Sequence, residues 1–174
     1  MDKILEALEK CNKLVDDLEL EEAEGQFDEL LKMVDEEQPS AIDAYYDYAA
    51  FKDIAGTADY KKAIKYATKA YKLCKKFYKE NKDLKTLLKQ AEIADFLGDL
   101  YYDSDKDKMV KYYKDAIKIW KKNLDDDKDT KLYISCDALD IGKHADEKEN
   151  YADAFKYFKL ALKMWNKYLK EEPN

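Results

Sequence analysis

Hydrophobic and polar residues alternate along this chain with the period of amphipathic α-helices. Small and aromatic residues recur at positions i, i+4 and i+7 in three separate segments. These triplets are Ala63, Ala67 and Ala70; Met109, Tyr113 and Ala116; and Ala154, Phe158 and Ala161. A small side chain lets a neighbouring helix approach, and an aromatic ring fills the gap one turn later. The pattern therefore predicts helices that pack in pairs and then stack.

Eight helices are expected from this pattern. The 174 residues include only four glycines and two prolines, which favours long helices with short turns over a β-rich fold. The expected helices cover residues 2–19, 24–36, 41–55, 59–80, 83–102, 106–123, 129–146 and 149–171. Helices joined by turns this short pack as antiparallel neighbours, so they form pairs over about 2–37, 40–80, 83–123 and 128–171.

The four pairs carry one signature to different degrees. In the last pair, Gly142 lies in the first helix and Tyr151 precedes the triplet of the second helix. The third pair repeats this order with Gly98. Phe51 stands where the second pair is expected to have glycine, and the first pair departs from the signature at Glu37. The first pair is therefore the poorest match.

Aligned on their second helices, the pairs place Leu30, Ala63, Met109 and Ala154 at equivalent positions, 33, 46 and 45 residues apart. This arrangement resembles the tetratricopeptide repeat, a helix–turn–helix unit of about 34 residues, in a variant with longer helices. The resemblance covers nearly the whole chain. It implies that residues 1–174 form a single all-α domain, an α-solenoid of about four antiparallel helix pairs in a right-handed superhelix. Another α-solenoid or a plain helical bundle is the structural alternative.

In that family the first helix of each pair lines a concave groove, which usually holds an extended peptide or a helix of a partner. By register, the resemblance gives this predicted groove the residues Asn12, Val15, Glu19, Tyr45, Tyr48, Lys52, Glu92, Asp95, Asp99, Tyr102, Cys136, Leu139 and Lys143. Packing between repeats is the alternative role for the tyrosines, and ordinary solvation is the alternative for the acids.

The expected partner is a protein or peptide with basic or amphipathic segments. Tyrosine offers a large rigid contact area with a hydroxyl group. Glu92, Asp95 and Asp99 favour lysine or arginine on the partner. Some relatives hold chaperone C-termini through lysine and asparagine at these positions, and the two aspartates disfavour that role. The leading hypothesis is a non-enzymatic protein-binding scaffold.

Charge supports a second hypothesis, binding to the anionic surface of a nucleic acid or membrane. Lysines follow two helical faces, at Lys61, Lys65, Lys69, Lys72, Lys76 and Lys79, and at Lys156, Lys159, Lys163, Lys167 and Lys170. However, the net charge is −7, and the first 40 residues alone contribute −10. Arginine is absent, which removes the bidentate fork that reads phosphates and guanine. We therefore expect no nucleic-acid partner and no membrane partner, and the lack of a long apolar run predicts no helix that spans a bilayer.

Catalytic chemistry is not expected. His144 is the single histidine, and no glycine-rich phosphate loop or metalloprotease motif occurs. The acidic run 103–107 opens with the spacing of an EF-hand loop, but Lys108 stands where that loop needs glycine. We interpret this run, and the run 125–129, as acids that favour a helix N-terminus. No cofactor and no metal are predicted.

The three cysteines, Cys11, Cys74 and Cys136, are far apart and show no metal-binding spacing. They predict free thiols in a reducing compartment, and no signal peptide is recognised, so a cytoplasmic location is expected.

The last expected helix has more apolar residues than one buried face needs: Phe155, Phe158, Leu162, Trp165 and Leu169. A longer parent protein or self-association through this helix is expected, and packing on the seventh helix is the alternative. A designed or fragmentary helical repeat without a ligand is the third hypothesis for the chain.

Overall fold

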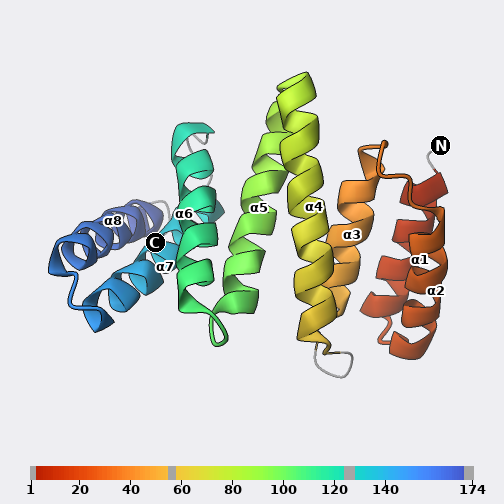
Figure 1. Cartoon of the computed structure of the whole chain (residues 1–174), viewed down its shortest axis with the longest axis horizontal. Coiled ribbons are helices and arrows are strands. Elements are labelled where there is room, and N and C mark those ends of the chain that lie inside the picture. The colour runs from red at the N-terminus through yellow and green to blue at the C-terminus, as the bar shows by residue number, and fades with distance from the viewer. Residues whose placement is uncertain (1–2, 55–57, 124–127, 171–174) are drawn as a thin grey trace. The chain divides into compact units, whose positions relative to one another are not determined.

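The computed structural model has eight α-helices and no strand among the residues it describes, which are 3–54, 58–123 and 128–170. The helices are α1 (Lys3–Asp16), α2 (Leu20–Met33), α3 (Ser40–Phe51), α4 (Tyr60–Asn81), α5 (Leu84–Tyr101), α6 (Lys106–Asn123), α7 (Lys128–Glu147) and α8 (Tyr151–Lys170) (Figure 1). The predicted all-α fold is confirmed. The chain divides into two compact units, Met1–Leu87 and Leu88–Asn174, with the boundary inside α5. That all four pairs form one continuous solenoid stays a prediction.

Aspartate and asparagine side chains cap four of the helices. Asp59, Asp83 and Asp105 each accept a hydrogen bond from the backbone N–H three residues later, over 2.8–3.0 Å. Asn150 caps α8 in the same way, over 3.3 Å. Such a side chain satisfies a backbone donor that the first helical turn leaves unpaired. Short polar residues therefore set the starts of α4, α5, α6 and α8.

Two of the turns between paired helices use the same backbone motif. Leu18, after α1, and Glu149, after α7, have left-handed φ angles of 60° and 57°. In each turn the following residue donates its N–H to the carbonyl five residues back, over 2.8 Å. This is the Schellman arrangement that ends many helices. It stops α1 at Asp16, three residues before the predicted end.

The third helix is also shorter than predicted. It ends at Phe51, and Lys52 donates its backbone N–H to the carbonyl of Tyr48 over 3.1 Å. Asp59 donates its backbone N–H to the carbonyl of Lys52 over 2.9 Å, which links the residue after α3 to the residue before α4. The predicted stop near Gly56 lies outside the described residues.

The second helix of every pair has the same register. The fourth residues of these helices are Ala23, Ala63, Met109 and Ala154, and all four are buried. Each donates its backbone N–H to the carbonyl of the residue before the helix, over 2.9–3.0 Å. The predicted equivalence of Ala63, Met109 and Ala154 is confirmed. The predicted place of Leu30 is wrong: it lies seven residues after Ala23 on the same helical stripe, where periodicity alone cannot separate the two.

Aromatic rings fill the core of the first unit. Phe27 of α2 stacks on Phe51 of α3 with ring centroids 5.1 Å apart, and Tyr48 lies 5.6 Å from Phe27. Leu8 and Cys11 of α1 belong to the same buried cluster. Phe51, which replaces the expected glycine, therefore holds α2 and α3 together. The first pair, predicted to be the poorest match to the repeat, packs into this core through its own aromatic residue, Phe27.

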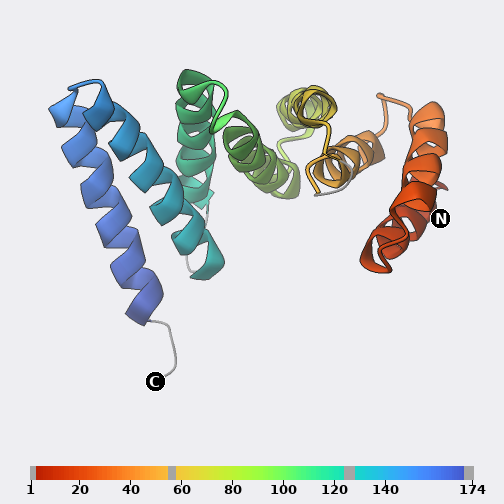
Figure 2. The ribbon, with the colours of Figure 1, turned by 90° about the horizontal axis from the view of Figure 1, so that it is seen from below.

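Glycines permit close helix contact in the second unit. A Cβ atom added at Gly142 of α7 would lie 2.6 Å from the ring of Phe158 on α8, and one at Gly98 of α5 would overlap the ring of Tyr113 on α6. Trp120 of α6 stacks on Tyr133 of α7, with centroids 5.9 Å apart. Helices α7 and α8 lie side by side along their length (Figure 2). Within the described ranges, no helix is both long and apolar enough to cross a membrane.

Candidate functional site

Three of the predicted groove residues of the first unit are buried. Tyr48 lies in the aromatic core, and Tyr45 donates its hydroxyl hydrogen to Glu36 over 2.7 Å. Lys52 is 3% exposed, pairs with Glu24 and lies over the ring of Phe51 at 5.0 Å from the centroid. The expectation that these side chains face a partner is wrong, because packing within the unit already covers them.

The remaining predicted groove residues of this unit are Glu19, Asn12 and Val15, and they lie in different surroundings. Glu19 is the residue before α2 and has no side-chain capping hydrogen bond, and its side chain is exposed. Asn12 donates to Asp47 across α1 and α3 over 2.9 Å, and Val15 packs against the core. The predicted groove side chains of the first unit therefore do not come together on one exposed surface.

In the second unit, the predicted acids follow one stripe of α5. Glu92 and Asp99 are exposed, and Asp95 between them is partly buried. Spacings of three and four residues place the three carboxyl groups on one helical face. These three are the acidic residues among the predicted groove residues of the second unit. The exposed Cys136 lies on α7.

Predicted apolar and basic residues of the second unit are accessible as well. Tyr102, after α5, is 38% exposed, and Leu139 of α7 is 42% exposed. Lys143 of α7 is exposed and donates to Asp140 over 2.8 Å. The predicted surface thus combines acids, one lysine and two apolar groups.

Asp137 of α7 is a functional candidate that the sequence reading missed. It is 3% exposed, and its carboxyl group hydrogen-bonds to that of Asp95 on α5. Its second oxygen, Oδ2, has no hydrogen-bond partner. The sequence did contain a signal for this residue. Asp137 lies between Ile134 and Ile141 on one helical stripe that is otherwise apolar, and burying a charge there costs free energy.

Burial sets the protonation of the Asp95–Asp137 pair. It raises the pKa of Asp95 to about 6, and the charges of Asp99 and Glu92 act in the same direction, whereas the hydrogen bond from Asp137 lowers that pKa. Burial also raises the pKa of Asp137 well above its ordinary value, and the nearby charge of Asp95 adds to this effect. Two carboxyl groups hydrogen-bond only when one carries a proton, so the pair holds a shared proton near neutral pH.

Tyr113 of α6 completes this group of side chains. Its hydroxyl donates to Asp99 Oδ1 over 2.6 Å. Burial is the largest cause that raises the pKa of Tyr113, and the hydrogen bond to Asp99 and the charges of Asp99, Asp137 and Asp140 raise it further. The phenol therefore stays protonated and acts as a donor. We use the term acidic cluster for Glu92, Asp95, Asp99, Asp137 and Asp140.

In the part of the chain that the structure describes, no group of three His, Cys, Asp or Glu side chains is placed so that it could hold a metal ion. Asp105 of the predicted acidic run caps α6, and Asp107 pairs with His144 and Lys148 of the α7 end. These contacts fit the interpretation as a helix N-terminus. Of the run 125–129, residues 125–127 lie outside the described residues.

The lysine faces differ between the two units. On α4, Lys69 pairs with Glu36 over 3.0 Å and Lys76 with Glu37 over 2.8 Å, so this face is partly neutralised. In the second unit, a hollow between α6 and α8 is lined by Lys114, Ile117, Lys118, Lys121, Lys122, Lys156, Tyr157 and Leu160. The hollow is therefore the more cationic candidate surface.

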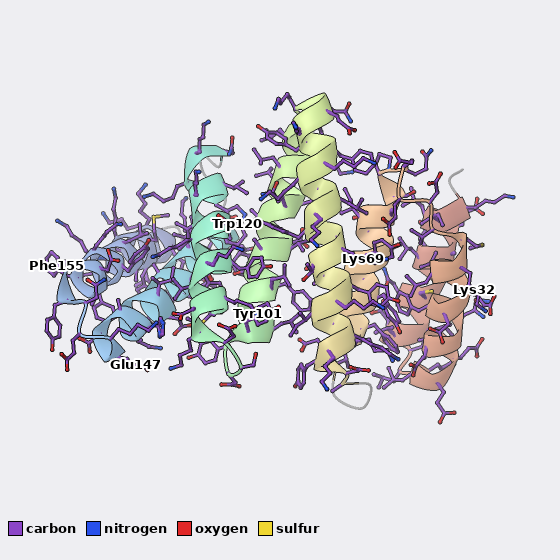
Figure 3. All side chains as sticks on the ribbon, in the orientation of Figure 1. Lys32, Lys69, Tyr101, Trp120, Glu147 and Phe155 are labelled. Carbon is purple, nitrogen blue, oxygen red and sulfur yellow. The ribbon has the colours of Figure 1, made fainter. Side chains whose placement is uncertain are left out.

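The outer face of α8 is apolar and exposed. Phe155 is 70% exposed and projects away from the helix (Figure 3), and Leu162 is 62% exposed. Phe158, in contrast, packs against Gly142. The packing alternative thus accounts for Phe158, while self-association through the other residues stays a prediction.

Comparison with models of known protein families gives no match, and comparison with curated proteins also gives none.

Proposed function

We propose that this chain is a non-enzymatic scaffold whose α5–α7 face binds a basic or amphipathic segment of another protein. The observation that carries this proposal is the hydrogen-bonded pair of partly buried Asp95 and buried Asp137, next to the exposed acids of α5. Burying carboxyl groups costs free energy that an apolar pair at the same helix contact would not cost. A feature that weakens the fold in this way is understandable if it serves recognition.

The surroundings of the pair fit a peptide better than a small ion. Tyr102 and Leu139 expose apolar area in the same unit as the acids. An amphipathic segment could cover the apolar side chains while its lysines or arginines meet Glu92 and Asp99. Because the binding residues lie on or next to helices that are already packed, little ordering cost falls on the scaffold.

The proposal includes a relationship to tetratricopeptide repeats with long helices. Its support is the shared register of Ala23, Ala63, Met109 and Ala154 and the contacts of Gly98 and Gly142 with aromatic rings. We also place the protein in the cytoplasm, because its cysteines are free thiols, two of them buried.

A displayed library of random twelve-residue peptides tests the proposal. Peptides enriched on the wild-type chain are measured against the double variant Asp95→Lys, Asp99→Lys, with helicity followed by circular dichroism. The control is the double variant Asp103→Lys, Asp146→Lys, which changes the net charge equally at two exposed acids outside the acidic cluster. We expect binding to the wild type and the control, and a loss of at least tenfold in the α5 variant. Equal binding to all three proteins would contradict the proposal.

A second candidate function is binding to an anionic surface through the hollow between α6 and α8. Five lysines surround its apolar floor, so a phosphate-rich surface would meet a concentrated positive charge. Retention on heparin across a salt gradient tests this function, with Lys118→Glu and Lys121→Glu as the variant. Early elution of the variant supports it, and retention that ignores salt excludes it.

A further inference from the structure

We propose that the acidic cluster is a receptor for one cationic side chain of the partner, a lysine ammonium or an arginine guanidinium, which hydrogen-bonds to Asp95 and Asp137. This inference deepens the proposed scaffold function and depends on it for the identity of the ligand as a peptide.

The first argument is a missing hydrogen-bond donor. Asp137 is 3% exposed, and its Oδ2 atom has no partner in the chain. A buried acceptor without a donor destabilises the fold, so such groups are uncommon unless a donor from a ligand or partner binds them. An ammonium or guanidinium group brings donors only, and it brings a positive charge to a place where acids gather.

The second argument is the sign of the surrounding charge. The titratable groups that act on the pair are Glu92 and Asp99 of α5 and Cys136 of α7. Tyr113 of α6 and Asp140 of α7 belong to the same neighbourhood. The lysines at its margin each pair with an acid three residues away on their own helix: Lys89 with Glu92 over 3.3 Å, and Lys143 with Asp140 over 2.8 Å. The ligand must therefore be positive.

The third argument concerns access and proton balance. Asp95 is partly exposed and hydrogen-bonds to the more deeply buried Asp137, so a ligand meets Asp95 first. When the cation binds, the shared proton leaves to solvent, the pair changes from one negative charge to two, and the cation supplies the compensating charge. An organic cation fits better than a metal ion, because among the described side chains no group of three ligands is placed so that it could hold a metal ion.

Tripeptides of matched shape provide the test. Acetyl-Gly-Arg-Gly-amide and acetyl-Gly-Lys-Gly-amide are titrated into the full chain, each beside its neutral counterpart containing citrulline or acetyl-lysine. The backbone amide signals of Gly98 and Gly142 report binding by NMR, since the chain has only four glycines and these two lie on α5 and α7. We expect shifts at Gly98 with the charged peptides and none with the neutral ones.

The proton balance makes a quantitative expectation. At pH 7 the cation displaces the shared proton, and at pH 5 it also displaces the proton of Asp95, whose pKa is about 6, so binding should be at least about tenfold weaker at pH 5 than at pH 7. In Asp137→Asn, the carboxamide donates to Asp95 and no proton is shared, so the charged peptides should bind at least fivefold more weakly at pH 7 and with a smaller pH dependence, because only Asp95 still titrates. Asp146→Asn on α7 removes the same charge at an exposed site and should behave as the wild type.

Each outcome decides one question. Equal shifts with charged and neutral tripeptides, or unchanged binding in Asp137→Asn, would overturn the receptor. If library peptides still bind the α5 face while Asp137→Asn has no effect on them, the receptor fails and the scaffold function stands. If the charged tripeptides bind as described but the library yields no peptide, the cation site stands and the scaffold function fails.

Discussion

The ring of Tyr113 on α6 occupies the space that a side chain at Gly98 on α5 would need. A Cβ atom added at position 98 would overlap this ring, whose hydroxyl is held by Asp99 over 2.6 Å. The ring therefore cannot move without loss of its hydrogen bond. The glycine of the repeat signature is required here by packing, since a helical glycine has no conformational advantage over alanine.

Gly98→Ala should destabilise the second unit by about 1–3 kcal/mol, because the added methyl group overpacks the contact. The matched control is Gly25→Ala in α2, where nothing lies within 4 Å of the added atom. That change should stabilise its helix by about 0.5–1 kcal/mol, since alanine has the higher helix propensity. Urea unfolding followed by circular dichroism measures both. A stabilised Gly98→Ala variant would contradict the packing relationship.

The sequence predicted the helices well because amphipathic period and capping residues are local. Asp59 and Asp105 start α4 and α6 through their own side chains, so a short window of sequence contains the signal. The ends of the helices were harder to predict from the sequence. Leu18 adopts a left-handed conformation although it is not glycine, so the sequence has no turn-forming residue at this position that would predict the end of α1.

The candidate site was only partly predictable, because burial depends on contacts between distant segments. Glu92, Asp95 and Asp99 were predicted from the register of the resemblance, and they do lie on one stripe of a helix. Tyr48 and Lys52 carry the same spacing, yet the rings of Phe27 and Phe51 cover that face. Helical spacing cannot show which face a neighbouring aromatic ring will occupy.

The Asp95–Asp137 pair should make the second unit less stable as pH rises. Both pKa values are raised in the folded chain, to about 6 for Asp95 and well above the ordinary value for Asp137, so from about pH 4 upward through these raised values the folded state binds more protons than the unfolded state. The stabilising contribution of the bound protons is fully present below about pH 4 and is lost as pH rises through the raised pKa values, first through that of Asp95 at about 6 and then through that of the shared proton. Asp137→Asn should remove this loss and be more stable than the wild type by about 1–3 kcal/mol at pH 7.5.

Tryptophan fluorescence reports this effect selectively, because Trp120 and Trp165 both lie in the second unit. The difference between variant and wild type should approach zero at pH 4. Lowered carboxyl pKa values elsewhere in the unit, at Asp105, Asp107 and Glu147, act at lower pH and are common to both proteins. A difference independent of pH would refute the shared proton.

The pairing of Lys52 with Glu24 predicts which of two variants is the more stable protein. Glu24→Gln removes the charge that balances the buried lysine and should cost about 1–3 kcal/mol. Lys52→Met keeps the stem against Phe51 and removes the buried charge, so it should be close to neutral or stabilising. Thermal unfolding of the two variants should rank Lys52→Met above Glu24→Gln. The reverse order would show that the lysine charge itself holds α2 and α3 together.

Leu18 and Glu149 should both be improved by glycine. Each has a positive φ angle that costs an ordinary residue about 1 kcal/mol, and each is exposed, so little packing is lost when its side chain is removed. We expect Leu18→Gly and Glu149→Gly to raise the free energy of unfolding by about 0.5–1 kcal/mol, less than the full strain because glycine also gains entropy in the unfolded chain. Chemical denaturation measures both, with Asp17→Gly, one residue before the left-handed position, as the control that should destabilise. If glycine destabilises at positions 18 and 149 as well, the shared turn motif does not set these helix ends.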